Sequence, residues 1–166
     1  MPYPPMAFQL DTARLTLRPW TESDADAHRT LVAERGGDVP SIEDNRRMIE
    51  DQRTASARTG IALLAVVRRD VGDFIGYCGL TVGRASVDEP EIAYELFRRV
   101  HGQGYATEAA SAVLNAAIAT GRTRLWSTVR PWNAPSLRVL EKLGFEHDHA
   151  AADDRGELLW LTRSLP

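Results

Sequence analysis

The 166-residue chain has one cysteine, Cys78, so it cannot form a disulfide within itself. That scarcity is typical of proteins in a reducing compartment, and we expect a cytoplasmic location with Cys78 in the core. The chain also lacks any apolar run near the ~20 residues that a membrane-spanning helix needs. Its first residues carry no positive segment followed by an apolar one, so we expect no signal peptide and no membrane partner.

An excess of positive charge is missing as well. The chain has 20 Lys and Arg against 23 Asp and Glu, a formal net charge of −3 at pH 7. Because proteins that bind nucleic acid through phosphate contacts usually carry a basic surface, we expect no nucleic-acid partner. Metal is not expected either, since His147 and His149 have no fixed third ligand nearby. We expect one domain over residues 1–166, with the proline-rich residues 1–9 as an extended arm.

The pattern of apolar residues predicts a mixed α/β chain of the order β-α-α-β-β-β-α-β-α-β-β. Residues 61–82 are expected to form a hairpin, and the helix over 41–58 is polar enough to lie on the surface. The predicted strands cover residues 14–20, 61–67, 74–82, 91–97, 124–129 and 157–163, with one more from Phe145. The predicted helices cover residues 21–34, 41–58, 105–119 and 133–144.

Two glycines, Gly102 and Gly104, stand between a predicted strand and a long helix of small residues. Glycine adopts positive φ angles and has no Cβ to block a ligand, and the N–H groups at a helix N-terminus attract anions. These features predict a phosphate cradle, suited to a pyrophosphate, although an ordinary glycine-rich turn would look similar. The spacing is not that of a P-loop, and Thr107 occupies the position where a dinucleotide-binding loop needs its third glycine.

The pattern that remains, Arg99-x-x-Gly102-x-Gly104, resembles the coenzyme A pyrophosphate loop of the GNAT (Gcn5-related) N-acetyltransferases. Three blocks carry the resemblance: residues 14–20 (RLTLRPW), residues 101–109 (HGQGYATEA), and Asn133-x-x-Ser136 leading into Gly144-Phe145. Together they look like the RimJ/RimL type and cover about residues 10–165. The resemblance implies the GNAT fold, whose order of elements matches the one predicted above.

The resemblance also implies acetyl-CoA as the cofactor and assigns the residues that would bind it. Arg99 either adds positive charge near the phosphates or is a solvated surface residue. Asn133 would contact the cofactor arm, although asparagine is also a preferred helix N-cap. The main chain at Phe97 and Val100 would pair with the pantetheine, and an N–H near Phe97 would stabilise the oxyanion. The loop residues assigned to the cofactor are Gly102, Gln103, Gly104, Tyr105, Ala106 and Thr107.

Acetyl transfer requires a neutral amine to attack the thioester carbonyl. A lysine amine (pKa ~10.4) is almost fully charged at neutral pH, whereas an α-amine (pKa ~7.7–8.0) is partly neutral, so a lysine acceptor needs a base more. Glu91 and Glu95 share one face of the strand over 91–97, so either is a candidate base or an exposed carboxylate. Many relatives carry a Tyr after the Gly-Phe pair, where this chain has Glu146. That departure leaves Ser136, or solvent, to protonate the leaving thiolate.

The predicted function is therefore an N-acetyltransferase that moves the acetyl group of acetyl-CoA to a primary amine by direct attack in a ternary complex. The acceptor would be a protein N-terminus or a small molecule such as an aminoglycoside or a polyamine, and Trp20 or Trp132 is a candidate to line its cleft. Two alternatives stay open: a non-catalytic acyl-CoA-binding domain, and another acyl-CoA as donor. A homodimer is compatible with the family.

Overall fold

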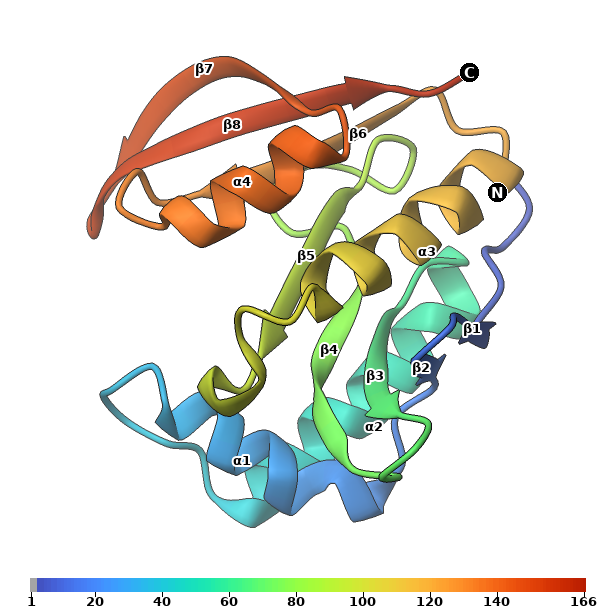
Figure 1. Cartoon of the computed structure of the whole chain (residues 1–166), viewed down its shortest axis with the longest axis vertical. Coiled ribbons are helices and arrows are strands. Elements are labelled where there is room, and N and C mark those ends of the chain that lie inside the picture. Colours follow the sequence, from blue (N-terminus) through green and yellow to red (C-terminus); the bar gives the residue numbers. More distant parts are fainter. Residues whose placement is uncertain (1–2) are drawn as a thin grey trace.

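The computed structural model describes residues 3–166 (Figure 1). In this part of the chain, eight strands form one sheet in the order β1-β2-β3-β4-β5-β6-β8-β7. Neighbouring strands are antiparallel except β5 and β6, which are parallel. The strands are β1 (Leu10–Asp11), β2 (Leu15–Arg18), β3 (Leu63–Arg68), β4 (Phe74–Thr81), β5 (Glu91–Leu96), β6 (Arg124–Val129), β7 (Glu146–Asp153) and β8 (Gly156–Ser164).

The helices also follow the predicted order. They are α1 (Ala25–Ala33), α2 (Ile42–Thr59), α3 (Tyr105–Ala119) and α4 (Ala134–Lys142). Ser41 caps α2 as its position predicts, because its hydroxyl accepts a hydrogen bond from the amide of Asp44 at 3.1 Å. The mixed α/β fold class and the hairpin of β3 and β4 are therefore confirmed.

Two details at the N-terminal end differ from the sequence prediction. The short edge strand β1 was not expected, because two residues are too few to show an alternating pattern. A 3-10 turn over Glu22–Asp24 precedes α1, so this helix begins later than predicted. Of the predicted arm 1–9, residues 1–2 lie outside the described part. The remainder forms no helix or strand, and Met6 is buried, with its amide bonded to the carbonyl of Gly60 at 2.9 Å.

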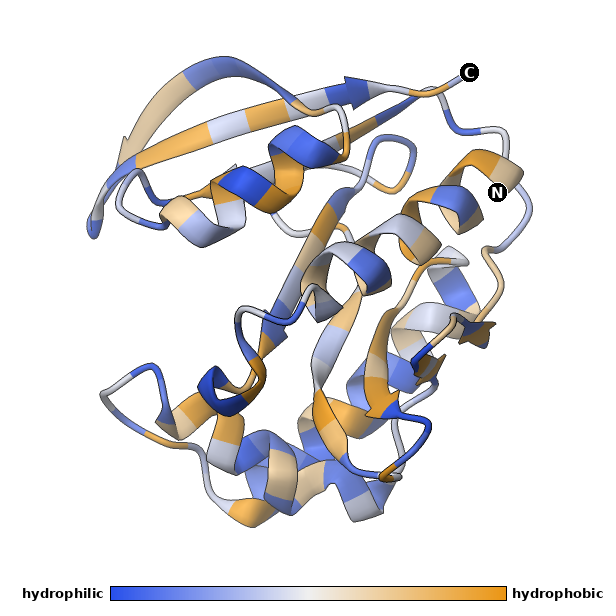
Figure 2. Ribbon diagram, in the orientation of Figure 1, coloured by the Kyte–Doolittle hydropathy of each residue, from blue (hydrophilic) through white to orange (hydrophobic). Residues whose placement is uncertain are grey.

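Helices cover both faces of the sheet. The strand β3 is apolar nearly throughout (Figure 2), as suits its place between β2 and β4 in the sheet. Its side chains alternate between the faces: Leu64 and Val66 join the large core that includes α3, whereas Ala65 joins a second cluster with residues of α1 and α2. Thus α1 and α2 pack on the face opposite to α3.

The parallel pair of β5 and β6 holds together only at its start. A single registered pair, Glu91 with Trp126, joins the two strands, supported by a bond from the Trp126 amide to the carbonyl of Pro90 at 3.0 Å. Beyond that pair the strands diverge towards their C-terminal ends (Figure 1), and α4 lies beside the opening. The gap between β5 and β6 leaves main-chain groups inside the sheet without a neighbouring strand.

Within residues 3–166, no helix has the length and apolarity needed to cross a membrane. No group of three or more His, Cys, Asp or Glu side chains in these residues is arranged to hold a metal ion.

Candidate active site

The glycine-rich loop adopts the conformation that its sequence predicts. Gly102 and Gly104 have φ angles of 78° and 83°, in the left-handed region where a side chain is strained. Gly104 is the N-cap of α3, so the turn directs the chain into the helix. A Cβ built on Gly102 would meet no atom within 4 Å, so the loop faces open space.

The main-chain amides of this loop are available to a ligand. The first hydrogen bond of α3 runs from the amide of Glu108 to the carbonyl of Gly104 at 3.0 Å. Within the described chain, the amides of residues 102–107 have no hydrogen-bond acceptor. Converging free amides at the N-terminus of a 15-residue helix form an anion site, so these residues fit a pyrophosphate.

Two arginines flank the loop. The Arg14 guanidinium lies 4.2 Å from the centre of the Tyr105 ring and pairs with Glu108 at 2.7 Å. Arg99, which the sequence singled out, is exposed and pairs with Asp73 at 3.2 Å. Arg14 was not singled out, because it precedes the loop by almost ninety positions and only the fold brings the two together.

The side chains of Phe97 and Val100 are buried, so only their main chain can meet a ligand. The amide of Phe97 itself donates to the carbonyl of Ile75 on β4 at 2.9 Å and is not free. Because antiparallel pairing alternates along β5, the amides of Tyr94 and Leu96 instead face the gap towards β6. Near Phe97, these two amides are therefore the candidate oxyanion donors.

Asn133 and Ser136 lie at the start of α4. Asn133 is its N-cap, and its side-chain oxygen accepts from the amide of Ser136 at 3.3 Å. The Ser136 hydroxyl lies 3.0 Å from the hydroxyl of Tyr94 on β5. Burial raises the pKa of Tyr94 to about 12, so this phenol stays protonated at neutral pH. Tyr94 is a residue that sequence reasoning missed, because its partner is 42 positions away.

The two candidate bases are both occupied. Glu91 is buried and accepts hydrogen bonds from the Thr128 hydroxyl at 2.6 Å and from the amide of Arg84. Glu95 is bonded by the guanidinium of Arg35 at the end of α1, with its Nε at 2.8 Å. Glu95 contacts Arg35, just after α1, whereas its neighbour Tyr94 contacts α4 on the other face of the sheet. The fold thus joins Ser136 with Tyr94 and separates it from Glu95.

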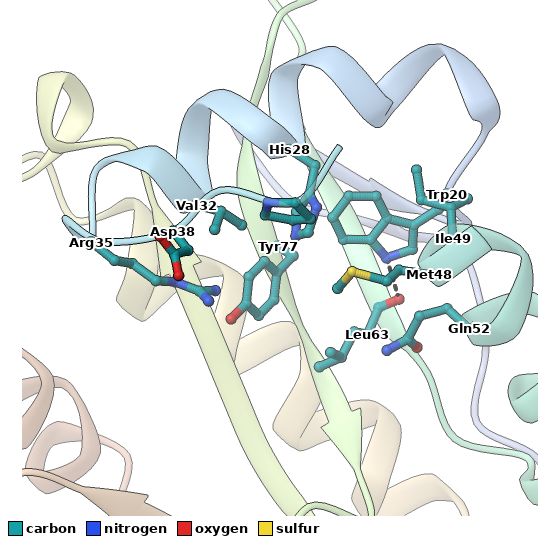
Figure 3. Close-up of a pocket in the computed structure, with 11 residues that line it drawn as sticks. Trp20, His28, Val32, Arg35, Asp38, Met48, Ile49, Gln52, Leu63 and Tyr77 are labelled. Atoms are coloured by element: carbon teal, nitrogen blue, oxygen red, sulfur yellow. Dashed lines mark hydrogen bonds between the residues drawn. The ribbon is translucent and has the colours of Figure 1, made fainter. Parts of the chain in front are cut away.

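Next to Glu95, a cavity of 360 Å³ lies between the sheet and the two helices α1 and α2 (Figure 3). Trp20 is 5% exposed and lines this cavity, whereas Trp132 is 79% exposed and does not. The Trp20 indole N–H donates to the carbonyl of Leu63 at 2.9 Å, which fixes the ring at the wall.

Fold and site together define a transferase that works with an acyl-CoA. Free amides at the start of α3 suit the pyrophosphate, and the opening of β5 from β6 exposes main-chain groups that an extended amide chain can pair with.

Comparison with known proteins gives the family. A family model described as an acetyltransferase (GNAT) domain matches residues 14–146. An uncharacterized N-acetyltransferase of Bacillus subtilis (strain 168), YoaA, is 31% identical over 152 residues, which cover 84% of this chain and 83% of that protein. The chain therefore belongs to the GNAT acetyltransferase family and is an acetyl-CoA-dependent acyltransferase.

Solved structures agree with this fold. The crystal structure of an acetyltransferase from Agrobacterium tumefaciens str. C58 is 28% identical, with a TM-score of 0.78 over 93% of each chain. RimL, a ribosomal L7/L12 α-N-protein acetyltransferase solved in complex with coenzyme A, has a TM-score of 0.81 at 17% identity. That alignment covers 95% of this chain and 98% of the RimL chain.

Proposed function

We propose that this enzyme acetylates a primary amine by direct attack within a ternary complex, and that its acceptor is an α-amine. Bound acetyl-CoA supplies the thioester carbonyl that the amine attacks. The amides of residues 102–107 hold the pyrophosphate, and the main chain at Phe97 and Val100, with Arg99 and Asn133 nearby, flanks the cofactor arm. The amide of Tyr94 or Leu96 stabilises the oxyanion from the gap between β5 and β6.

The observation that carries the choice of acceptor is the occupation of both carboxylates. Glu91 is bonded to Thr128 and Arg84, and Glu95 is bonded to Arg35, so neither is a free general base. An acceptor amine that is partly neutral without a general base is then favoured. An α-amine meets this condition, and a lysine side chain does not. The name of RimL, an α-N-protein acetyltransferase, describes an acceptor of the same kind.

Ser136 and Tyr94 would supply the proton for the leaving thiolate. The Ser136 hydroxyl is next to the gap at the start of α4, and the buried phenol of Tyr94 lies 3.0 Å away. The serine donates its proton to the sulfur, and the phenol can replace that proton along the hydrogen bond. The nitrogen of the acceptor loses one proton to solvent, and solvent returns one to the phenol, so the protons balance.

The test is mass spectrometry of peptides incubated with the enzyme and acetyl-CoA. One peptide has a free N-terminus and no lysine, and its matched control has a blocked N-terminus and one internal lysine. We expect acetylation of the first peptide only. Thermal stabilisation by acetyl-CoA without any acetylated amine would instead identify an acyl-CoA-binding domain, and preferential competition by succinyl-CoA would indicate another donor.

A further inference from the structure

The cavity between the sheet and the helices α1 and α2 is lined mainly by uncharged side chains, together with Arg35 and Asp38. Apolar and aromatic side chains from both helices and from the sheet form these walls (Figure 3). Met48, at 46% exposure, lies at the surface end, whereas Trp20 and Ile49 are buried. The chief residues of the wall are Trp20, His28, Val32, Met48, Ile49 and Tyr77.

The titratable groups that face this cavity are neutral, paired or at its rim. Burial lowers the pKa of His28, so its ring is uncharged at neutral pH. Burial raises the pKa of Tyr77 to about 12, so its phenol is uncharged as well. Arg35 is held by Glu95, and Asp38 is an exposed residue of the segment between α1 and α2. Asp38 is the one carboxylate among the residues that line the cavity, and it is exposed, so an ammonium group at the buried wall of Trp20 and Ile49 would lose its hydration without a carboxylate there.

The cavity borders β5 through two of its lining residues, Tyr77 and Arg35. Tyr77 on β4 is the cross-strand neighbour of Glu95 on β5, and Arg35 bonds directly to Glu95. The adjacent residues, Tyr94 and Leu96, are those whose amides face the gap between β5 and β6. Glu95 is thus the residue between the cavity and the two amides at the gap, and a group attached to the attacking amine would pass it to reach the cavity.

The size of the cavity limits what this group can be. Its 360 Å³ is near the lower end of the ~300–1,000 Å³ range of ligand pockets. A space of this size holds one aliphatic chain or one aromatic ring, and a multi-ring aminoglycoside exceeds it.

We propose that this cavity binds an uncharged aliphatic or aromatic group carried next to the acceptor amine, an inference that rests on the proposed acetyl transfer. The acceptor is then an α-amine with an apolar side chain, either at a peptide N-terminus or on a small molecule. We expect polyamines and aminoglycosides to be poorer acceptors than such an amine.

The experiment compares two tripeptides that begin with norleucine or with lysine, whose side chains have similar shape but differ in the terminal methyl or ammonium group. We expect kcat/KM for α-amine acetylation to be about tenfold or more higher for the norleucine peptide. The two free amino-acid amides form a second arm, which distinguishes a peptide N-terminus from a small-molecule acceptor. A lysine peptide that matches or exceeds the norleucine peptide would overturn the proposal.

Two variants connect this preference with the cavity. Met48→Glu places a carboxylate at the wall, and its matched control Val71→Glu makes a similar change at a residue that is 60% exposed and outside the cavity. We expect Met48→Glu to reduce the norleucine preference about tenfold and Val71→Glu to leave it unchanged. Val32→Phe fills the cavity and should raise KM for the norleucine peptide while acetyl-CoA still stabilises the protein. Equal preferences in Met48→Glu and Val71→Glu would refute the assignment.

A binding measurement separates this inference from the proposed function. The Trp20 indole N–H resonance reports on the cavity wall, so titration with each amide shows occupancy without turnover. If norleucine amide shifts this resonance and no amine is acetylated, the proposed transfer is wrong and the cavity assignment stands. If peptides are acetylated but this resonance never moves, the cavity assignment is wrong and the transfer stands.

Discussion

Replacing Gly102 by glutamate should weaken the binding of acetyl-CoA about a hundredfold, with backbone strain as the only other consequence for the fold. The φ angle of Gly102 is 78°, and a Cβ there would meet no atom within 4 Å. Gly72, in the turn between β3 and β4, has a φ of 82° and equally open surroundings, so Gly72→Glu is a matched control. Each substitution should cost ~1–2 kcal/mol of folding free energy, because L residues are disfavoured in this region.

The difference between the two variants appears only with the cofactor. A ligand at ~100 times its Kd stabilises a protein by about 2.7 kcal/mol, whereas a hundredfold weaker ligand contributes only ~0.4 kcal/mol at the same concentration. For a chain of this length, ~1 kcal/mol corresponds to a shift of about 2–4 °C in Tm. Acetyl-CoA should therefore raise Tm by about 5–10 °C for the wild type and Gly72→Glu.

The expected shift for Gly102→Glu is ~1 °C, because its carboxylate lies where the loop amides would bind the pyrophosphate. The assay is thermal unfolding of all three proteins with and without acetyl-CoA. Equal cofactor-induced shifts in Gly102→Glu and Gly72→Glu would show that the loop does not bind the cofactor.

Two further predictions concern hydrogen-bonded pairs. Tyr94→Phe should lower kcat about tenfold and leave KM for acetyl-CoA unchanged. The double variant Tyr94→Phe/Ser136→Ala should be no slower than Ser136→Ala alone, since both residues act on one proton. Additive losses of kcat in steady-state kinetics would contradict the relay. Asp24→Asn should destabilise the protein by about 2 kcal/mol at pH 7, because the buried Asp24 carboxylate bonds Arg18 at 2.8 Å and the amide of Thr21 at 2.8 Å. Burial opposes ionisation of Asp24, but these hydrogen bonds outweigh it and lower the pKa of Asp24. The carboxylate therefore contributes to the free energy of unfolding above pH ~4, and this contribution is lost as the pH falls through the pKa of the folded state. Urea unfolding of both proteins should show the difference narrowing at acidic pH, and a constant difference would refute this account.

The parts of the site that sequence could predict depend on local geometry. Gly102 and Gly104 stand between a strand and a helix, and that context alone determines a turn with positive φ angles and free amides. Asn133 and Ser136 were likewise recognisable from their position at the start of a helix. Cys78 was expected in the core and is fully buried.

The parts that sequence could not predict depend on contacts between distant segments. The partner of Tyr94 is 42 positions away, and no local pattern distinguishes this residue from any other aromatic residue in a strand. The same holds for the pairing of Glu95 with Arg35, which are 60 positions apart. A strand pattern could show that Glu91 and Glu95 share a face, but not that each carboxylate already has a partner.

The divergence of β5 from β6 gives β5 two kinds of amide proton. The amides of Ala93 and Glu95 are paired with β4, whereas those of Tyr94 and Leu96 face the gap. Along one strand, hydrogen exchange should therefore alternate between slow and fast at successive residues. A cofactor chain hydrogen-bonded in the gap would slow the exchange of the Tyr94 and Leu96 amides and remove the alternation. Occupancy of the site could then be followed, without turnover, from the exchange rates of these two amides.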